Sequence, residues 1–169
     1  MQGLVLSGEG LSIEDVAHSA GISRDGREIS PVKISLSENG KQKIEHSRNV
    51  LERIEARGDY VYGVSTGFGA LKSELISPEH RVKLQENLIR SHSAGVGEYL
   101  HKTDVRAAMT VLAGCLSRGK SGIPLDVVEC LIAFLNTDAI PFVPSRGSLG
   151  ASGDLAPLAH IALALMGES

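Results

Sequence analysis

Residues 147–160 of the 169-residue chain read Gly-Ser-Leu-Gly-Ala-Ser-Gly-Asp-Leu-Ala-Pro-Leu-Ala-His, and the apolar run continues to Met166. Glycine at every third position of the first half predicts a loop with unusual backbone angles. The second half predicts a helix that is apolar nearly all round, which must be covered on every side. Because the chain ends soon afterwards, we expect it to be part of a longer protein rather than a self-associating whole.

The loop alone leaves its chemistry open. A glycine loop that feeds a helix could hold a phosphate at the helix N-terminus, but this one lacks the lysine of a P-loop. The run Gly150-Ala151-Ser152-Gly153 does not match the Gly-x-Ser-x-Gly turn of serine hydrolases either, and no catalytic triad can be proposed.

The rest of the chain predicts helices. Ser12 with Asp15 forms a capping-box pattern, and further helices are expected over 37–56 (with Gly58 as a stop) and 77–93, then from Thr103 and from Pro124. An Asp-Gly pair at 25–26, between short β-favouring runs, predicts a small hairpin. The predicted fold class is mainly α with a small β element near the N-terminus, in a single domain over 1–169.

Composition excludes several classes of function. The net charge of −3 leaves no basic field for nucleic acid, and aromatic residues at 4% without tryptophan provide no stacking platform for single strands. No apolar run is long enough to span a bilayer, so no membrane partner is expected. Cys115 and Cys130 lack metal-ligand spacing and are expected to be reduced core thiols. With no secretory signal pattern in residues 1–11, we expect a cytoplasmic protein without a metal.

Two further segments carry unusual residues. Residues 62–69 read Tyr-Gly-Val-Ser-Thr-Gly-Phe-Gly, which taken alone favours a plain turn. Residues 87–97 read Asn-Leu-Ile-Arg-Ser-His-Ser-Ala-Gly-Val-Gly and place His92 at the end of a helix. A lone histidine in that setting is usually a structural residue or a favourable C-terminal charge.

The three segments together resemble the aromatic amino-acid ammonia-lyases. Residues 147–160 resemble the signature of that family, 62–69 resemble its Tyr-Gly-x-x-Thr-Gly-Phe-Gly, and 87–97 resemble its third shared segment. All three stand in the family's order and approximate spacing, and the resemblance runs from about Leu11 onward. It implies the N-terminal part of the helical fold shared by aspartases and ammonia-lyases.

The resemblance also implies a prosthetic group made from the backbone. Eliminating ammonia from an amino acid needs a strong electrophile, which ordinary side chains do not supply. In the family, the nitrogen of Gly153 attacks the carbonyl of Ala151, and Ser152 loses its hydroxyl as water, giving methylidene-imidazolone. Asp154 resembles the carboxylate that assists this cyclisation. The positive end of the following helix should favour electron uptake by the ring.

Further roles come only from the resemblance. Tyr62 is similar to the family's catalytic base on a mobile loop, although an ordinary tyrosine is a poor base at neutral pH and needs activation or a proton relay. His92 lies where the family contacts the substrate ring. Ser91-His92 resembles the members that convert L-histidine to urocanate, whereas Phe-Leu and His-Leu are typical of the phenylalanine and tyrosine enzymes.

Family enzymes are longer and assemble as homotetramers, and their later segments supply an Asn, a second Tyr, an Arg and a Glu. We therefore expect an amino-acid substrate and a homo-oligomer for the parent protein, with this chain by itself inactive and its tripeptide unmodified. Two alternatives remain open: a tyrosine or phenylalanine ammonia-lyase or aminomutase, and a non-catalytic helical assembly domain.

Overall fold

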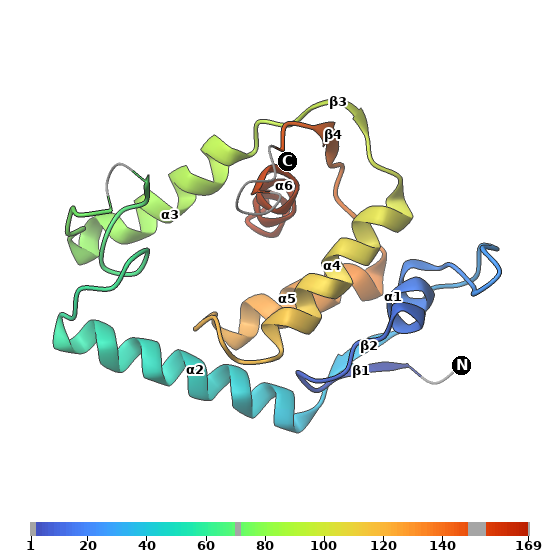
Figure 1. Ribbon diagram of the computed structural model, residues 1–169, viewed down its shortest axis with the longest axis horizontal. Helices are drawn as coiled ribbons and strands as arrows, with labels where there is room; N and C mark the ends of the chain where they lie inside the picture. The colour runs from blue at the N-terminus through green and yellow to red at the C-terminus, as the bar shows by residue number, and fades with distance from the viewer. Residues whose placement is uncertain (1–2, 70–71, 149–154, 169) are drawn as a thin grey trace.

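The computed structural model describes residues 3–69, 72–148 and 155–168, and they form a mainly helical chain (Figure 1). The helices are α1 (Ile13–Ala20), α2 (Glu38–Arg57), α3 (Pro78–His92), α4 (Lys102–Leu116), α5 (Leu125–Thr137) and α6 (Leu155–Leu165). The strands are β1 (Leu4–Leu6), β2 (Ile34–Leu36), β3 (Val96–Tyr99) and β4 (Pro144–Arg146). The predicted fold class is confirmed.

The core lies between α4 and α5, which pack against each other along their apolar faces. Apolar residues at three- and four-residue spacing on each helix turn toward the partner, as an amphipathic helix requires. Strands β1 and β2, the start of α2, and α6 cover this pair. The buried apolar cluster consists of Leu6, Ile34, Ile44, Val105, Met109, Ala113, Val128, Leu131, Ile132, Leu135, Val143 and Ile161.

The β element near the N-terminus is a parallel pair. Leu4 pairs with Ile34 and Leu6 with Leu36, and α1 forms the long crossover that a parallel pair requires. The predicted hairpin around residues 25–26 forms only in minimal form. Ile22 and Glu28 make one isolated antiparallel bridge, and the amide of Ser23 donates to the Arg27 carbonyl across the turn. The Ser23 side chain adds further bonds within this turn.

Helix ends follow local capping chemistry. Ser12 and Asp15 form the predicted capping box on α1, and Gly58 ends α2 in the left-handed region at φ 72°. The prediction that Thr103 caps the next helix is wrong. The N-cap of α4 is His101, whose ring nitrogen Nδ1 accepts the amide hydrogen of Thr103. Histidine can cap here because a neutral ring offers one acceptor nitrogen.

A buried arginine joins the ends of two helices. Arg106 on α4 is 3% exposed, and its guanidinium donates to the carbonyls of Ser19 at 3.1 Å and Leu135 at 2.9 Å. These carbonyls lie in or near the last turns of α1 and α5, where the helix dipole is negative. Arg106 also donates to Asp138, and Lys102 binds the same carboxylate. The hydrogen bond from Lys102, with the charge of Arg106, lowers the pKa of Asp138.

A second two-stranded sheet was not anticipated from the sequence. Strand β3 follows α3 and pairs antiparallel with β4, with Val96 opposite Arg146 and Tyr99 opposite Pro144. This pairing brings the segment after His92 next to the segment that leads toward the 147–160 motif. Among the described residues, no helix is long and apolar enough to cross a membrane.

Candidate functional site

His92 is the last residue of α3 and is held by its own helix. Its Nδ1 lies 2.8 Å from the carbonyl oxygen of Leu88, one turn earlier. Because a carbonyl only accepts, Nδ1 carries the hydrogen, and the neutral ring then presents Nε2 as an acceptor. The Ser91 hydroxyl donates to the same carbonyl at 2.9 Å and lies 3.2 Å from Nδ1. The Ser91-His92 pair is therefore arranged to fix one tautomer of the histidine.

Tyr62 lies on a loop that is closed by its own hydrogen bonds. The phenol ring is 61% exposed and packs edge-on against Phe68, with ring centroids 5.9 Å apart. Gly63 has φ 72°, and a Cβ there would lie 2.9 Å from the Phe68 ring, so the turn after Tyr62 accepts only glycine.

Two buried hydroxyls hold this loop together. The Ser65 hydroxyl accepts the amide hydrogen of Val61 at 2.8 Å and donates to the Asp59 carbonyl at 2.8 Å. The Thr66 hydroxyl accepts from Gly63 at 3.2 Å and donates to the Gly67 carbonyl at 3.0 Å. Both side chains are at most 3% exposed. These two hydroxyls therefore shape the turn that presents Tyr62, a role that the residue types alone do not reveal.

Ala151, Ser152, Gly153 and Asp154 lie outside the described residues, so their predicted roles remain predictions. The described chain resumes at Leu155, where α6 begins. Ala156, Ala159 and Ile161 of α6 are buried, whereas Leu155 and Leu158 are 48% and 41% exposed. The helix that follows the tripeptide is thus anchored on one side and open on the other.

The His92 segment and α6 meet at a close backbone contact. Gly95, three residues after His92, donates its amide hydrogen to Nε2 of His160 at 3.1 Å. A Cβ on Gly95 would lie 3.0 Å from that nitrogen and 3.0 Å from the Pro144 side chain. A Cβ on Gly147 would lie 2.9 Å from the Cα of Gly95. Three chain segments therefore converge where a side chain would not fit.

A salt bridge joins the same elements further along. The Arg90 guanidinium contacts both carboxylate oxygens of Glu168, at 2.6 and 2.9 Å. Hydrogen bonding from Arg90 lowers the pKa of Glu168. The sequence analysis gave no role to His160 or Glu168. His160 stood inside the quoted motif, but its partner is a backbone amide, which no side-chain pattern reveals.

The structure brings two of the three motif segments together. Figure 1 shows α6 beside β3 and β4, near the C-terminal end of α3, whereas the loop of Tyr62 contacts α3 at Gln85, whose side chain donates to the Gly63 carbonyl at 3.5 Å. Gln85 is seven residues before His92 on α3, which corresponds to roughly 10 Å along the helix axis. Among the described residues, no hydrogen bond joins the Tyr62 loop to the His92 segment or to α6.

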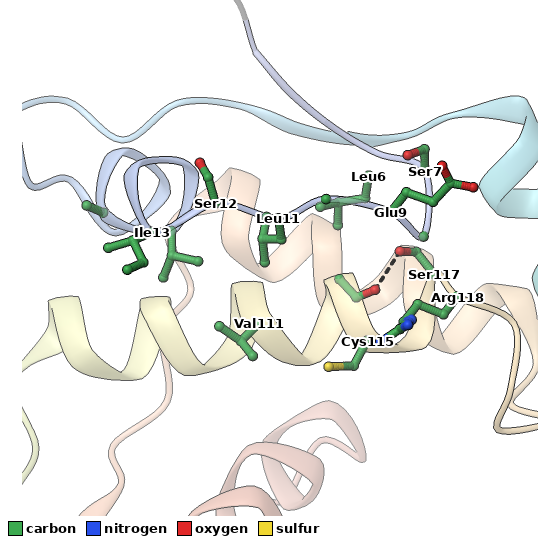
Figure 2. A pocket seen from close by; sticks show the side chains of 15 residues that line it. Leu6, Ser7, Glu9, Leu11, Ser12, Ile13, Val111, Cys115, Ser117 and Arg118 are labelled. Atoms are coloured by element: carbon green, nitrogen blue, oxygen red, sulfur yellow. Dashed lines mark hydrogen bonds between the residues drawn. The ribbon is translucent and has the colours of Figure 1, made fainter.

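A separate groove of about 850 Å³ lies between the β1–α1 connection, α1 and α4 (Figure 2). Leu11, Ile13 and Val111 give it an apolar lining, and Cys115 lies along one side. No residue predicted for the site lines this groove. Cys115 is exposed, so the prediction of two core thiols is wrong for this residue, because it faces away from the α4–α5 contact. Neither cysteine forms a disulfide among the described residues.

The sequence is similar to known proteins over nearly its whole length. Residues 11–169 match the family described as aromatic amino acid lyase. Over 168 residues, 99% of the chain, the sequence is 45% identical to the histidine ammonia-lyase of Caldanaerobacter subterraneus subsp. tengcongensis. It is 44% identical over 162 residues, 96% of the chain, to that of Streptococcus sanguinis. The matched regions are 32% and 30% of those proteins, so the chain spans about a third of the length of these relatives.

Solved structures agree with the sequence comparison. Histidine ammonia-lyase from Trypanosoma cruzi matches 99% of the chain with a TM-score of 0.83 and 34% identity. Tyrosine aminomutase from Streptomyces globisporus also matches 99%, with a TM-score of 0.87 and 33% identity. The chain covers 31% and 30% of these two structures, respectively.

Proposed function

The chain belongs to the aromatic amino acid lyase family, and from that premise we propose that the family-length protein is a histidine ammonia-lyase. By family-length protein we mean this chain together with the sequence that completes the length of its relatives. The reaction removes ammonia from L-histidine and leaves urocanate, whose new double bond is conjugated with the imidazole ring. The identities of 45% and 44% to histidine ammonia-lyases support this choice within the family.

The observation that carries the proposal is the hydrogen bond that fixes the tautomer of the His92 ring. With Nδ1 bonded to the Leu88 carbonyl, Nε2 is left as the acceptor of the ring, which suits a ligand that donates. The imidazole of L-histidine has such an N–H, whereas the phenyl ring of phenylalanine has none. A site that hydrogen-bonds a substrate N–H rejects analogues that lack it, because its polar group is then left unpaired.

The residues present suit the methylidene-imidazolone that the family uses. Gly153 has no side chain to hinder attack by its nitrogen, Ser152 carries the hydroxyl that leaves, and the ring forms with loss of two water molecules. Asp154 is proposed to assist this cyclisation. Helix α6 begins at the next residue, Leu155, so the positive end of its dipole lies at this part of the chain. The ring would supply the electrophile that allows the amino group to leave.

Tyr62 is proposed to take the β-proton of the substrate. Its phenol is exposed and is placed by a turn whose amides and carbonyls are bonded by Ser65 and Thr66. General-base catalysis requires hydrogen-bond reach to the proton. Gly63, next to Tyr62, is bonded to Gln85 on the same helix as His92, and we propose that Tyr62 reaches the substrate from this loop or from the same loop of a second copy of the protein.

The test is turnover by the family-length protein. We expect L-histidine to give urocanate, followed by its ultraviolet absorbance, with release of free ammonia and little reaction of L-tyrosine or L-phenylalanine. Ser152→Ala is the matched control, because it removes the departing hydroxyl and adds no bulk. The variant should lack the mass loss of two waters and should lose turnover.

Three results would replace the proposal. The aminomutase neighbours make one of them specific: an aminomutase would return the amino group to the β-carbon, so that a β-amino acid forms without net ammonia release. If tyrosine or phenylalanine reacts faster than histidine, the preferred substrate is that amino acid and not histidine. If no amino acid reacts although the ring has formed, the chain is a non-catalytic assembly domain.

We further propose a cytoplasmic homotetramer. The unpaired state of Cys115 and Cys130 supports a reducing compartment. The exposed apolar residues of α6, Leu155 and Leu158, support burial against further protein. Light scattering of the family-length protein measures its assembly state, and a monomer would contradict the proposal.

A further inference from the structure

The contact between Gly95 and His160 joins two segments to which the proposed function gives separate roles. Gly95 is three residues after His92, so the chain between them spans at most about 11 Å. His160 lies on α6, which begins immediately after Asp154. The 3.1 Å hydrogen bond therefore ties the proposed substrate-ring contact to the helix that follows the proposed electrophile.

The geometry around this bond leaves little freedom. Gly95 fits between His160 and Pro144, where a Cβ would be 3.0 Å from atoms of either side chain. Strand pairing of Val96 with Arg146 fixes the next residue. Gly95 and His160 are both half-buried, so the amide hydrogen would be poorly satisfied if the imidazole were removed.

A second contact holds α6 near its C-terminal end. Glu168 follows α6 and binds Arg90, two residues before His92. With His160 near the middle of α6 and Glu168 beyond its end, the helix is held to α3 and its continuation at two places. The exposed salt bridge between Arg90 and Glu168 contributes little to the free energy of folding. The half-buried hydrogen bond from Gly95 to His160 is therefore the contact whose loss should have the larger effect.

We propose that His160 is a positioning residue that sets the place of His92 relative to α6, the helix that begins at Leu155. It does so by accepting the Gly95 amide hydrogen, which requires the neutral ring with its hydrogen on Nδ1. The inference rests on the proposed function, since it gives His92 the substrate ring and gives 151–153 the electrophile. His160 touches neither substrate nor reacting atoms in this assignment.

Substitutions at His160 can separate the effect of its hydrogen bond from the effect of its side-chain volume. His160→Leu keeps an apolar side chain of moderate size and removes the acceptor. His160→Gln places an amide oxygen near the position of Nε2 and restores the acceptor. Gly95→Ala disturbs the same contact from the other side, because its Cβ would press on His160 and Pro144. His46→Leu is the matched control, since His46 is exposed on α2.

Three readouts are made on the family-length protein. Hydrogen exchange of a peptide containing Gly95 reports the bond itself, and we expect faster exchange in His160→Leu and near wild-type exchange in His160→Gln. Peptide mass reports the ring, and the loss of two waters should persist in every variant. Kinetics with L-histidine should show KM raised about tenfold in His160→Leu and Gly95→Ala, with kcat changed less.

The outcomes are distinguishable. Unchanged exchange and unchanged KM in His160→Leu would overturn the proposal, and so would loss of the ring mass signature, which would assign His160 to cyclisation instead. A tenfold KM effect that His160→Gln does not relieve would also overturn it, because the acceptor would then be irrelevant. If the wild-type protein does not convert histidine at all, the proposed function fails, while the exchange result still decides whether His160 holds Gly95.

Discussion

Replacing Arg106 with methionine should destabilise this chain more than any exposed arginine replacement. Methionine retains most of the unbranched apolar stem and removes all donors. The Ser19 carbonyl then loses the side-chain donor it has in the structure, at 3.1 Å, and the Leu135 carbonyl keeps only the amide of Asp138 at 3.4 Å. The two helix ends also lose their cation.

The magnitude follows from these losses. A buried acceptor left without a donor costs about 1–3 kcal/mol, and the loss of a partly buried cation at a helix C-terminus costs up to about 2 kcal/mol at each end. Part of this is offset because methionine has no charge to desolvate, and because Asp138 is 54% exposed and stays hydrated. We expect the free energy of unfolding to fall by about 3 kcal/mol, a large part of the 5–15 kcal/mol typical of a domain.

Urea denaturation followed by circular dichroism measures this, since the chain lacks tryptophan. Arg27→Met is the matched control: the side chain of Arg27 is 82% exposed and pairs only with a nearby Asp25. The control should leave the free energy of unfolding unchanged within error. For a chain of this length the midpoint of thermal unfolding should drop by roughly 6–12 °C in Arg106→Met. Equal stabilities of the two variants would refute the assignment of Arg106 to the helix ends.

The remaining predictions concern the proposed site and acid stability. Tyr62→Phe in the family-length protein should abolish most turnover while the mass loss of two waters persists, and near-normal turnover would place the base elsewhere. Ser91→Phe combined with His92→Leu should weaken turnover of L-histidine far more than it changes the thermal midpoint, and unchanged kinetics would remove the role of His92. The pKa of Asp138 is lowered from its ordinary 3.8, chiefly by Lys102, so its stabilising effect is complete above that value and is lost as the pH falls through the lowered pKa. Asp138→Asn should therefore flatten the fall in the free energy of unfolding between about pH 5 and pH 2, and an identical acid profile in the variant would contradict this assignment.

Helix positions were largely predictable because they depend on nearby residues. The Ser12–Asp15 box and the Gly58 stop each act within four residues, so the sequence contains their whole cause. The parallel β1–β2 pair and the β3–β4 pair were missed. The paired residues are 30 apart in the first sheet and 45 or 50 apart in the second, and strands of three or four residues carry too little periodicity to be recognised.

The site was predictable in part for a similar reason. The three motif segments could be recognised because their residue types are unusual in combination. The contact between Gly95 and His160 was not predictable, because a backbone amide gives no sign of its partner in the sequence. Ser65 and Thr66 were quoted in the motif, yet their bonds run to main-chain atoms of the same turn.

The closed turn around Tyr62 lowers the entropic cost of ordering this loop around a ligand. A flexible glycine loop would lose backbone conformational entropy on closing over a ligand. This loss costs roughly 1–2 kcal/mol of free energy for each residue fixed. Here the amides of Val61 and Gly63 are already bonded to Ser65 and Thr66 before any ligand arrives. The turn is therefore preorganised by its own hydrogen bonds. Most of the entropic cost of shaping the turn is met during folding rather than in each catalytic cycle.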